Sequence, residues 1–248
     1  MVIRLRKVNS VFLASSLIAA FGLALGLGPS CTGQSMLQVS RYTSTLFSFT
    51  FDFQRDAAWQ RKHNQALEYV HHTSRAQLAV DLRNVLKKRG MDSPAGAGAA
   101  YLMVLHDIDR EASLRRLEAA HQNGSVAVEE SLPDAFADIA IRLHSREAAR
   151  FLVAMPNGDY DCENQAIAID RLFLVSPELL VSVVSKSPAL RKTFLELLPF
   201  GAWNAQQPIE PVQIVATKHL SQSHGTELAI YRKIARMKDW LRSARSAR

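Results

Sequence analysis

Cysteine is almost absent from this chain of 248 residues, since Cys31 and Cys162 are the only two. Two thiols are too few for a metal site made of cysteines alone, and they allow one disulfide at most. Acidic residues are absent from the start of the chain, where Asp52 is the first. A start that is basic and free of acidic residues is typical of targeting segments.

Several local motifs of enzymes are missing as well. The chain has no His-Glu-x-x-His zinc motif, no phosphate-binding loop ending in Lys-Ser or Lys-Thr, and no Gly-x-Ser-x-Gly nucleophile turn. The glycines of Gly96-Ala97-Gly98 follow no strand pattern, so we interpret this segment as the start of a helix. Any chemistry must therefore come from residues that are far apart in the sequence.

An apolar stretch of about 17 residues, Val11 to Leu27, follows three basic residues near the N-terminus. This length is close to the roughly 20 residues of a membrane-spanning helix. We expect a signal or anchor segment over 1–28 that attaches the protein to a membrane through residues 11–27, with the body outside the cytoplasm by the positive-inside rule. The alternatives are a lipoprotein signal cleaved before Cys31 and import into an organelle.

The rest of the chain predicts a helical domain with a linker on either side. Residues 29–51 are rich in Ser and Thr and predict a linker with one short strand at most. Helical spacing dominates from there on, so we predict an all-α fold with a core domain over 52–200. A Pro-containing linker over 201–217, with a strand signal at Val212–Val215, precedes a basic tail over 218–248.

The tail contains a second candidate for function. It carries eight Lys or Arg residues against two acidic ones, although the chain as a whole has a net charge of only +7. Apolar residues at helical spacing over 225–248 predict a basic amphipathic helix that binds anionic lipid or an acidic protein partner. The alternative is a helix docked on the body with its basic face in solvent. We do not expect nucleic acid as a partner, because no recognisable binding fold accompanies the charge.

Four ionisable positions lie in or beside apolar helical segments, where a charge is costly unless it is paired or bound to a metal. Two histidines and two aspartates that converge would form a site for a divalent metal ion. These candidates are His71, with His72 as its substitute, His106, Asp107 and Asp170.

The segments around these residues resemble the HD superfamily of metal-dependent phosphohydrolases. The run Ala99-Ala100-Tyr101-Leu102-Met103-Val104-Leu105-His106-Asp107-Ile108 is similar to the central helix of that superfamily, and His71 stands 35 residues before His106. The run Ala166-Ile167-Ala168-Ile169-Asp170-Arg171-Leu172 resembles its final motif. The resemblance covers about residues 66–180.

The resemblance implies an all-helical fold and a phosphohydrolase activity. By that implication His71, His106, Asp107 and Asp170 hold a divalent cation, which activates water for attack on a phosphate ester. No general acid or substrate-binding residue is assigned. His121 and His144 could extend the set to a second metal, but each lies on a charged helical segment that favours exposure to solvent.

The alternative to a metal site is a structural role for the same residues. His106 and Asp107 would then end one helix, and Asp170 would pair with Arg171 or Arg142. In that case the protein is an anchored helical scaffold without enzyme activity. It would contact its partner or lipid through the basic tail.

Overall fold

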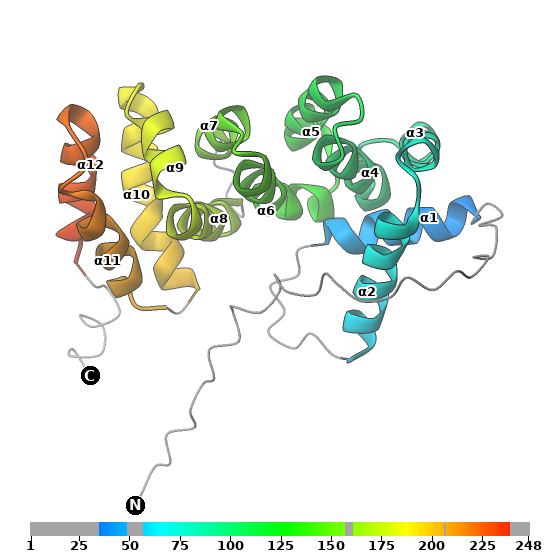
Figure 1. Cartoon of the computed structure of the whole chain (residues 1–248), viewed down its shortest axis with the longest axis horizontal. Coiled ribbons are helices and arrows are strands. Elements are labelled where there is room, and N and C mark those ends of the chain that lie inside the picture. Colours follow the sequence, from blue (N-terminus) through cyan, green and yellow to red (C-terminus); the bar gives the residue numbers. More distant parts are fainter. Residues whose placement is uncertain (1–34, 49–56, 157–160, 206, 239–248) are drawn as a thin grey trace, which may run out of the picture. The chain divides into compact units, whose positions relative to one another are not determined.

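The fold is described from a computed structural model, which covers residues 35–48, 57–156, 161–205 and 207–238. All regular structure in these ranges is helical, and none of their residues forms a strand (Figure 1). The all-α prediction is confirmed. The helices are α1 (Met36–Phe47), α2 (Ala57–His72), α3 (Arg75–Arg89), α4 (Pro94–Leu105), α5 (Arg110–Asn123), α6 (Val126–Leu143), α7 (Arg146–Ala154), α8 (Asp161–Val175), α9 (Pro177–Val184), α10 (Pro188–Asn204), α11 (Glu210–His219) and α12 (Gly225–Ala235).

Local capping signals position the starts of several helices. The Oγ of Ser74 accepts a hydrogen bond from the backbone N–H of Gln77 at 3.3 Å, and Ser93 does the same for Gly96 at 3.1 Å. These hydroxyls satisfy N–H groups that have no partner in the first helical turn. Proline, whose missing N–H is not needed in the first turn, is the first residue of three helices. These residues are Pro94, Pro177 and Pro188.

The most extensive packing joins α8 with α10 and α1 with α4, which are not consecutive along the chain. Helices α4, α6, α8 and α10 contact one another in that order, and α3, α5, α7 and α9 lie against this row (Figure 1). Helix α1 packs on α4, while α11 and α12 pack on each other and on α8 and α9. One continuous hydrophobic core joins the two rows.

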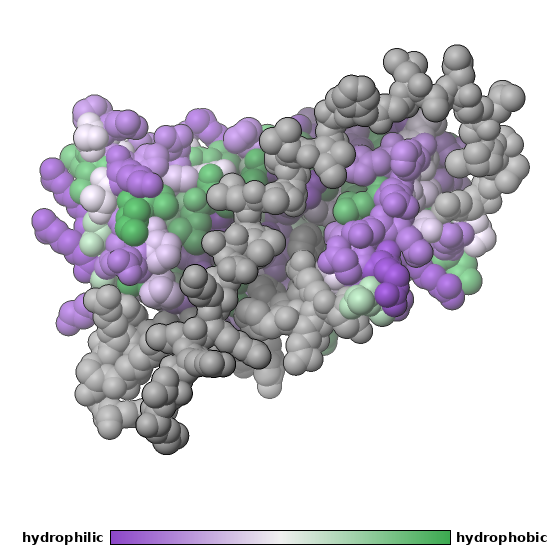
Figure 2. All heavy atoms as spheres, turned by 60° about the horizontal axis from the view of Figure 1, so that its bottom comes forward, coloured by the Kyte–Doolittle hydropathy of each residue, from purple (hydrophilic) through white to green (hydrophobic). Residues whose placement is uncertain are grey.

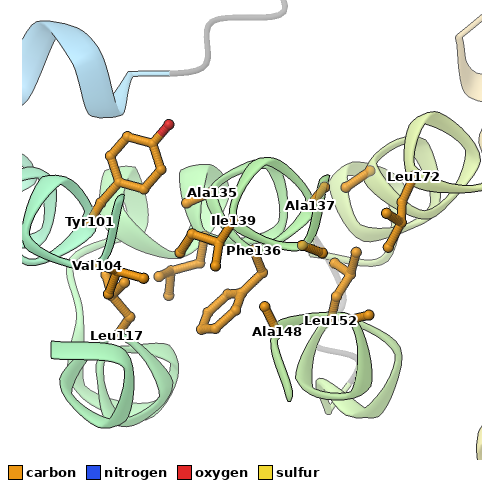
Figure 3. Packing of buried hydrophobic residues seen from close by; sticks show 14 of the residues in the cluster. Tyr101, Val104, Leu117, Ala135, Phe136, Ala137, Ile139, Ala148, Leu152 and Leu172 are labelled. Carbon is orange, nitrogen blue, oxygen red and sulfur yellow. The ribbon is translucent and has the colours of Figure 1, made fainter. Parts of the chain in front are cut away.

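Helix α6 contributes the large side chain Phe136 to the middle of this core. Phe136 is fully buried, and its ring centroid lies 4.5 Å from that of Phe151 in α7. Figure 3 shows Leu117 of α5 and Ala148 and Leu152 of α7 on the same side of α6 as Phe136. Burying one side chain of this size stabilises the folded protein by roughly 1.5–3 kcal/mol. Helix α6 is therefore held firmly by its apolar face.

Two helical glycines allow neighbouring backbones to approach closely. A Cβ atom at Gly98 of α4 would lie 2.2 Å from the carbonyl oxygen of Thr43 in α1. A Cβ atom at Gly201 of α10 would lie 2.2 Å from the carbonyl oxygen of Ala166 in α8. Both distances are far below van der Waals contact, so a side chain at either position would push two helices apart.

The prediction that residues 29–51 form a linker is corrected for the part that the structure describes. Residues 36–47 form α1, which buries Val39, Leu46 and Phe47. The alternating Phe residues thus belong to a helix as far as Phe47, because contact with α4 outweighs their preference for strands. The remaining positions, 29–34 and 49–51, lie outside the described residues.

The predicted linker over 201–217 and the strand signal within it are also corrected. Residues 201–204 complete α10, and the segment Val212–Val215 belongs to α11. Val212 and Ala216 are buried one helical turn apart, so the segment gains more from one apolar helix face than from an isolated strand.

The prediction of a membrane-spanning helix is corrected as well. Within the described ranges, no helix is both long and apolar enough to cross a membrane. Helix α4, the most apolar by composition, has 12 residues and is about 18 Å long at 1.5 Å per residue. It lies in the core against α1, α3, α5 and α6. The expected anchor segment, 11–27, lies outside the described residues.

The described surface shows small apolar groups among polar side chains. In the face shown in Figure 2, hydrophobic residues are scattered between hydrophilic ones. The large hydrophobic side chains that are exposed come from six different helices, so they do not mark one docking face. They are Leu37, Val80, Val126, Val175, Trp203 and Ile214.

Candidate functional site

The predicted histidines lie at the ends of two helices, and His71 is near enough to His106 to affect its pKa. His71 and His72 are exposed at the end of α2, and His106 is half-buried at the C-terminus of α4. Burial lowers the pKa of His106, and the charges of His71, Arg142 and Arg75 lower it further. The imidazole of His106 is therefore held in its neutral form near neutral pH.

Asp107 follows His106 in a left-handed backbone conformation, with φ of 54°. Its side chain is largely exposed and forms an ion pair with Arg75 of α3, with 3.2 Å between Nη2 and Oδ2. Arg75 also donates a hydrogen bond to the backbone carbonyl of Asp107. The carboxylate that the resemblance assigns to a metal ion is thus already next to a fixed positive charge.

Asp170 lies in a different environment, on the face of α8 that packs against α10. Its side chain is buried, and a Cβ atom at Gly201 would lie 3.0 Å from the Cβ of Asp170. Burial raises the pKa of Asp170 from 3.8 to about 7, and its Oδ1 has no hydrogen-bond partner. A carboxyl group with this pKa is half-protonated near neutral pH, and the protonated form is a poor metal ligand.

The described structure gives no support for one shared divalent cation at these positions. All the predicted ligands are among the described residues, and within that part of the chain no group of three or more His, Cys, Asp or Glu is placed to hold a metal ion. The ion pair of Asp107 and the burial of Asp170 give physical reasons for this. The metal site implied by the HD resemblance stays a prediction.

Among the described residues, Asp170 forms no ion pair with Arg171 or Arg142, the alternative that the sequence suggested. Arg171 pairs with Asp134, and Arg142 pairs with Asp138. Of the two histidines for which exposure to solvent was favoured over a second metal, His144 is exposed where α6 ends, and His121 is half-buried with its ring centroid 6.5 Å from that of Phe151.

A polar network that the sequence analysis missed links the central helices. Tyr101 of α4 donates its hydroxyl hydrogen to Asp138 of α6 at 2.6 Å, and Nε of Arg142 lies 2.9 Å from the same carboxylate. One turn earlier on α6, Nη1 of Arg171 from α8 lies 2.9 Å from the buried carboxylate of Asp134. Figure 3 shows the hydroxyl of Tyr101 pointing away from the labelled apolar side chains.

The role of this network is structural. Burial and the charge of Asp138 raise the pKa of Tyr101 well above its ordinary value, so its hydroxyl remains protonated. Each carboxylate is neutralised by an arginine, which leaves neither as a free base. The signal that could have identified the network is the four-residue spacing of Asp134, Asp138 and Arg142 on one helix face.

Helix α12 is docked on the body through its apolar face. Ile230, Tyr231 and Ile234 are at most 2% exposed. The ring centroid of Tyr231 lies 6.3 Å from that of Phe173 in α8 and 5.1 Å from that of His219 in α11. The described helix ends at Ala235, and residues 239–248 of the predicted amphipathic helix lie outside the described residues.

The opposite side of α12 is basic and faces solvent. Arg232, Lys233 and Arg236 are exposed, and together with Ala229 and Met237 they line a shallow depression of about 520 Å³. Among the described residues, none of these three cations forms an ion pair. We call Arg232, Lys233 and Arg236 the α12 basic surface.

Comparison of the chain with protein-family models, with curated proteins and with solved structures finds no match. The case for a function therefore rests on the residues and surfaces described above.

Proposed function

We propose that this protein is a helical scaffold without enzyme activity that binds an acidic protein partner through the α12 basic surface. The main support for this proposal is the way in which α12 packs against the rest of the protein. Its apolar residues Ile230, Tyr231 and Ile234 are buried in the body, while Arg232, Lys233 and Arg236 face solvent without an acidic partner among the described residues.

An acidic protein fits this surface better than a lipid bilayer does. A helix that binds lipid inserts its apolar face between the headgroups, and the apolar face of α12 is occupied by the core. An acidic protein needs only complementary charge and a shape that matches the depression beside Met237. The exposed guanidinium groups can also hold carboxylates through two parallel hydrogen bonds.

The phosphohydrolase hypothesis has less support from the same structure. Its metal would need Asp107 and Asp170 in one site, but Asp107 is paired with Arg75 and Asp170 is buried against α10. The buried tyrosine network cannot replace them, because its carboxylates already have arginine partners.

The test is binding of the full chain to a fluorescent poly-glutamate peptide, measured by anisotropy. We expect the triple variant Arg232→Gln, Lys233→Gln, Arg236→Gln to bind roughly tenfold or more weakly, since each exposed pair is worth about 0.5 kcal/mol. We also expect a weaker dependence of affinity on salt in this variant.

A matched control removes the same charge from another surface. The variant Lys87→Gln, Lys88→Gln, Lys192→Gln changes three exposed cations on α3 and α10. We expect it to bind the peptide like the wild type. Equal loss in both variants would show that net charge, and not the α12 basic surface, drives binding. Tighter binding to phosphatidylserine vesicles than to the peptide, lost in the α12 variant, would also overturn the proposal.

A further inference from the structure

A groove between α1, α2 and the N-terminus of α4 has no role in the proposed function. Its volume is about 820 Å³, which lies within the range of roughly 300–1,000 Å³ typical of sites for small ligands. Three cations from three helices line it, and among the described residues no Asp or Glu does. The cations are Arg41 of α1, Lys62 of α2 and Arg89 of α3.

The positive charge of this groove is not neutralised by the described residues. None of Arg41, Lys62 and Arg89 forms an ion pair with them. Within the described ranges, the one hydrogen bond of these side chains runs over 3.4 Å from Nε of Arg89 to the hydroxyl of Ser40. Three neighbouring cations without counter-ions repel one another, so an anion in the groove would relieve an unfavourable interaction.

Hydroxyl groups and helix ends add to the preference for an anion. Ser44 lines the groove, and Ser35 and Ser93 are the N-caps of α1 and α4 at its rim. The N-terminus of a helix carries a partial positive charge, so both helices add to the field of the cations. A multiply charged anion gains most from such a field.

The groove also offers apolar surface. Leu37 is 52% exposed there, and the ring of Tyr42 and the side chains of Pro94 and Ala95 also line the groove. A purely inorganic anion would leave this surface in contact with water. A ligand that joins an aromatic or apolar part to its charged group would cover it.

We infer that this groove binds a small organic phosphate, that is, a phosphate-bearing molecule with an aromatic or apolar part. Arginine guanidinium groups match phosphate oxygens through two parallel hydrogen bonds, and Lys62 of α2 supplies a third charge. This site is separate from the α12 basic surface and does not depend on the proposed function.

Calorimetric titration of the full chain tests the inference, with adenosine triphosphate, tripolyphosphate and adenosine as probes and without divalent cations. We expect adenosine triphosphate to bind more tightly than tripolyphosphate, and adenosine not to bind. We expect Arg41→Gln and Arg89→Gln each to weaken binding of adenosine triphosphate roughly tenfold, since each removes a charge-assisted hydrogen bond. Both side chains are exposed, so the helical circular dichroism should not change.

The double variant Arg116→Gln, Arg150→Gln, at exposed positions outside both basic surfaces, is the matched control, and we expect it to bind adenosine triphosphate like the wild type. Absence of binding in the wild type would overturn the inference. So would an equal loss of affinity in the control, or tripolyphosphate binding as tightly as adenosine triphosphate. The poly-glutamate experiment on the α12 basic surface has a separate readout, so either proposal can fail alone.

Discussion

The hydroxyl of Tyr101 and the carboxylate of Asp138 are 2.6 Å apart, and this hydrogen bond joins the two central helices α4 and α6. Tyr101 is 4% exposed, so its hydroxyl needs a partner inside the protein. Arg142 lies 2.9 Å from the same carboxylate and balances its charge. Residue pairs of this kind fix how neighbouring helices meet.

Replacing this tyrosine tests the energetic role of the pair. We expect Tyr101→Phe to lower the free energy of unfolding by about 1–2 kcal/mol, because Asp138 loses a donor in a mostly buried place. Urea denaturation measures the change. Tyr42→Phe is the control, since the hydroxyl of Tyr42 only accepts a hydrogen bond from the exposed Gln38. A loss of the same size in the control would mean that the contact between Tyr101 and Asp138 contributes nothing specific.

The close approach of α1 and α4 leads to a second prediction. We expect Gly98→Ala to destabilise the protein by roughly 1–3 kcal/mol, because its Cβ would lie 2.2 Å from the carbonyl oxygen of Thr43. The midpoint of chemical denaturation reports the loss. The intrinsic preference of alanine for helices acts in the opposite direction, so a gain in stability would show that the two helices separate without cost.

Gly225→Ala is a matched control for this substitution. Gly225 has φ of 54°, and a Cβ atom there would have no neighbour within 4 Å. The control therefore measures only the cost of a left-handed conformation, about 1 kcal/mol. We expect Gly98→Ala to lose more stability than Gly225→Ala.

The burial of Asp170 predicts a dependence of stability on pH. Its pKa in the folded protein is about 7 and its ordinary value is 3.8. The folded state therefore holds its proton over a pH range where the unfolded chain releases it, so stability falls between about pH 4 and pH 7. Below that range the carboxyl group is protonated in both the folded and the unfolded state, so its burial no longer lowers stability.

The variant Asp170→Asn should remove this pH dependence. At pH 8 we expect it to be more stable than the wild type by up to about 4 kcal/mol, and at pH 4 we expect a much smaller difference. Denaturation at several pH values measures the slopes. Asp107→Asn, at an exposed position, should keep the slope of the wild type. If Asp170→Asn kept that slope too, the acid would not be held neutral by burial.

Much of the fold could be predicted from local signals in the sequence. Ser93 and Pro94 predict the start of α4, and Asn123 with Gly124 predicts the end of α5, because capping depends on residues next to the helix end. The segments misread as linker or strand are α1 and α11. Their helical state depends on contact with α4 and α12, which no local pattern contains.

The candidate site was harder to predict for a similar reason. The sequence identifies His106, Asp107 and Asp170 as unusual, but it does not contain the distances between them. Arg75 lies 32 residues before Asp107, and its ion pair with that carboxylate changes what the carboxylate can do. The surroundings of each residue decide its chemistry, and helices distant in sequence provide them.

Metal analysis tests the site that the HD resemblance implies. We expect purified wild type and Asp107→Ala, after equilibration with Mn²⁺ or Zn²⁺ and gel filtration, to retain the same small amount of metal. The physical reason is that Arg75 is paired with Asp107, and Asp170 is kept partly protonated by burial. Asp81→Ala is the control for loss of a carboxylate, since Asp81 is not one of the predicted ligands and accepts hydrogen bonds from Tyr69 and Gln77. One metal ion per wild-type chain, lost in Asp107→Ala but kept in Asp81→Ala, would contradict this expectation and support the phosphohydrolase hypothesis.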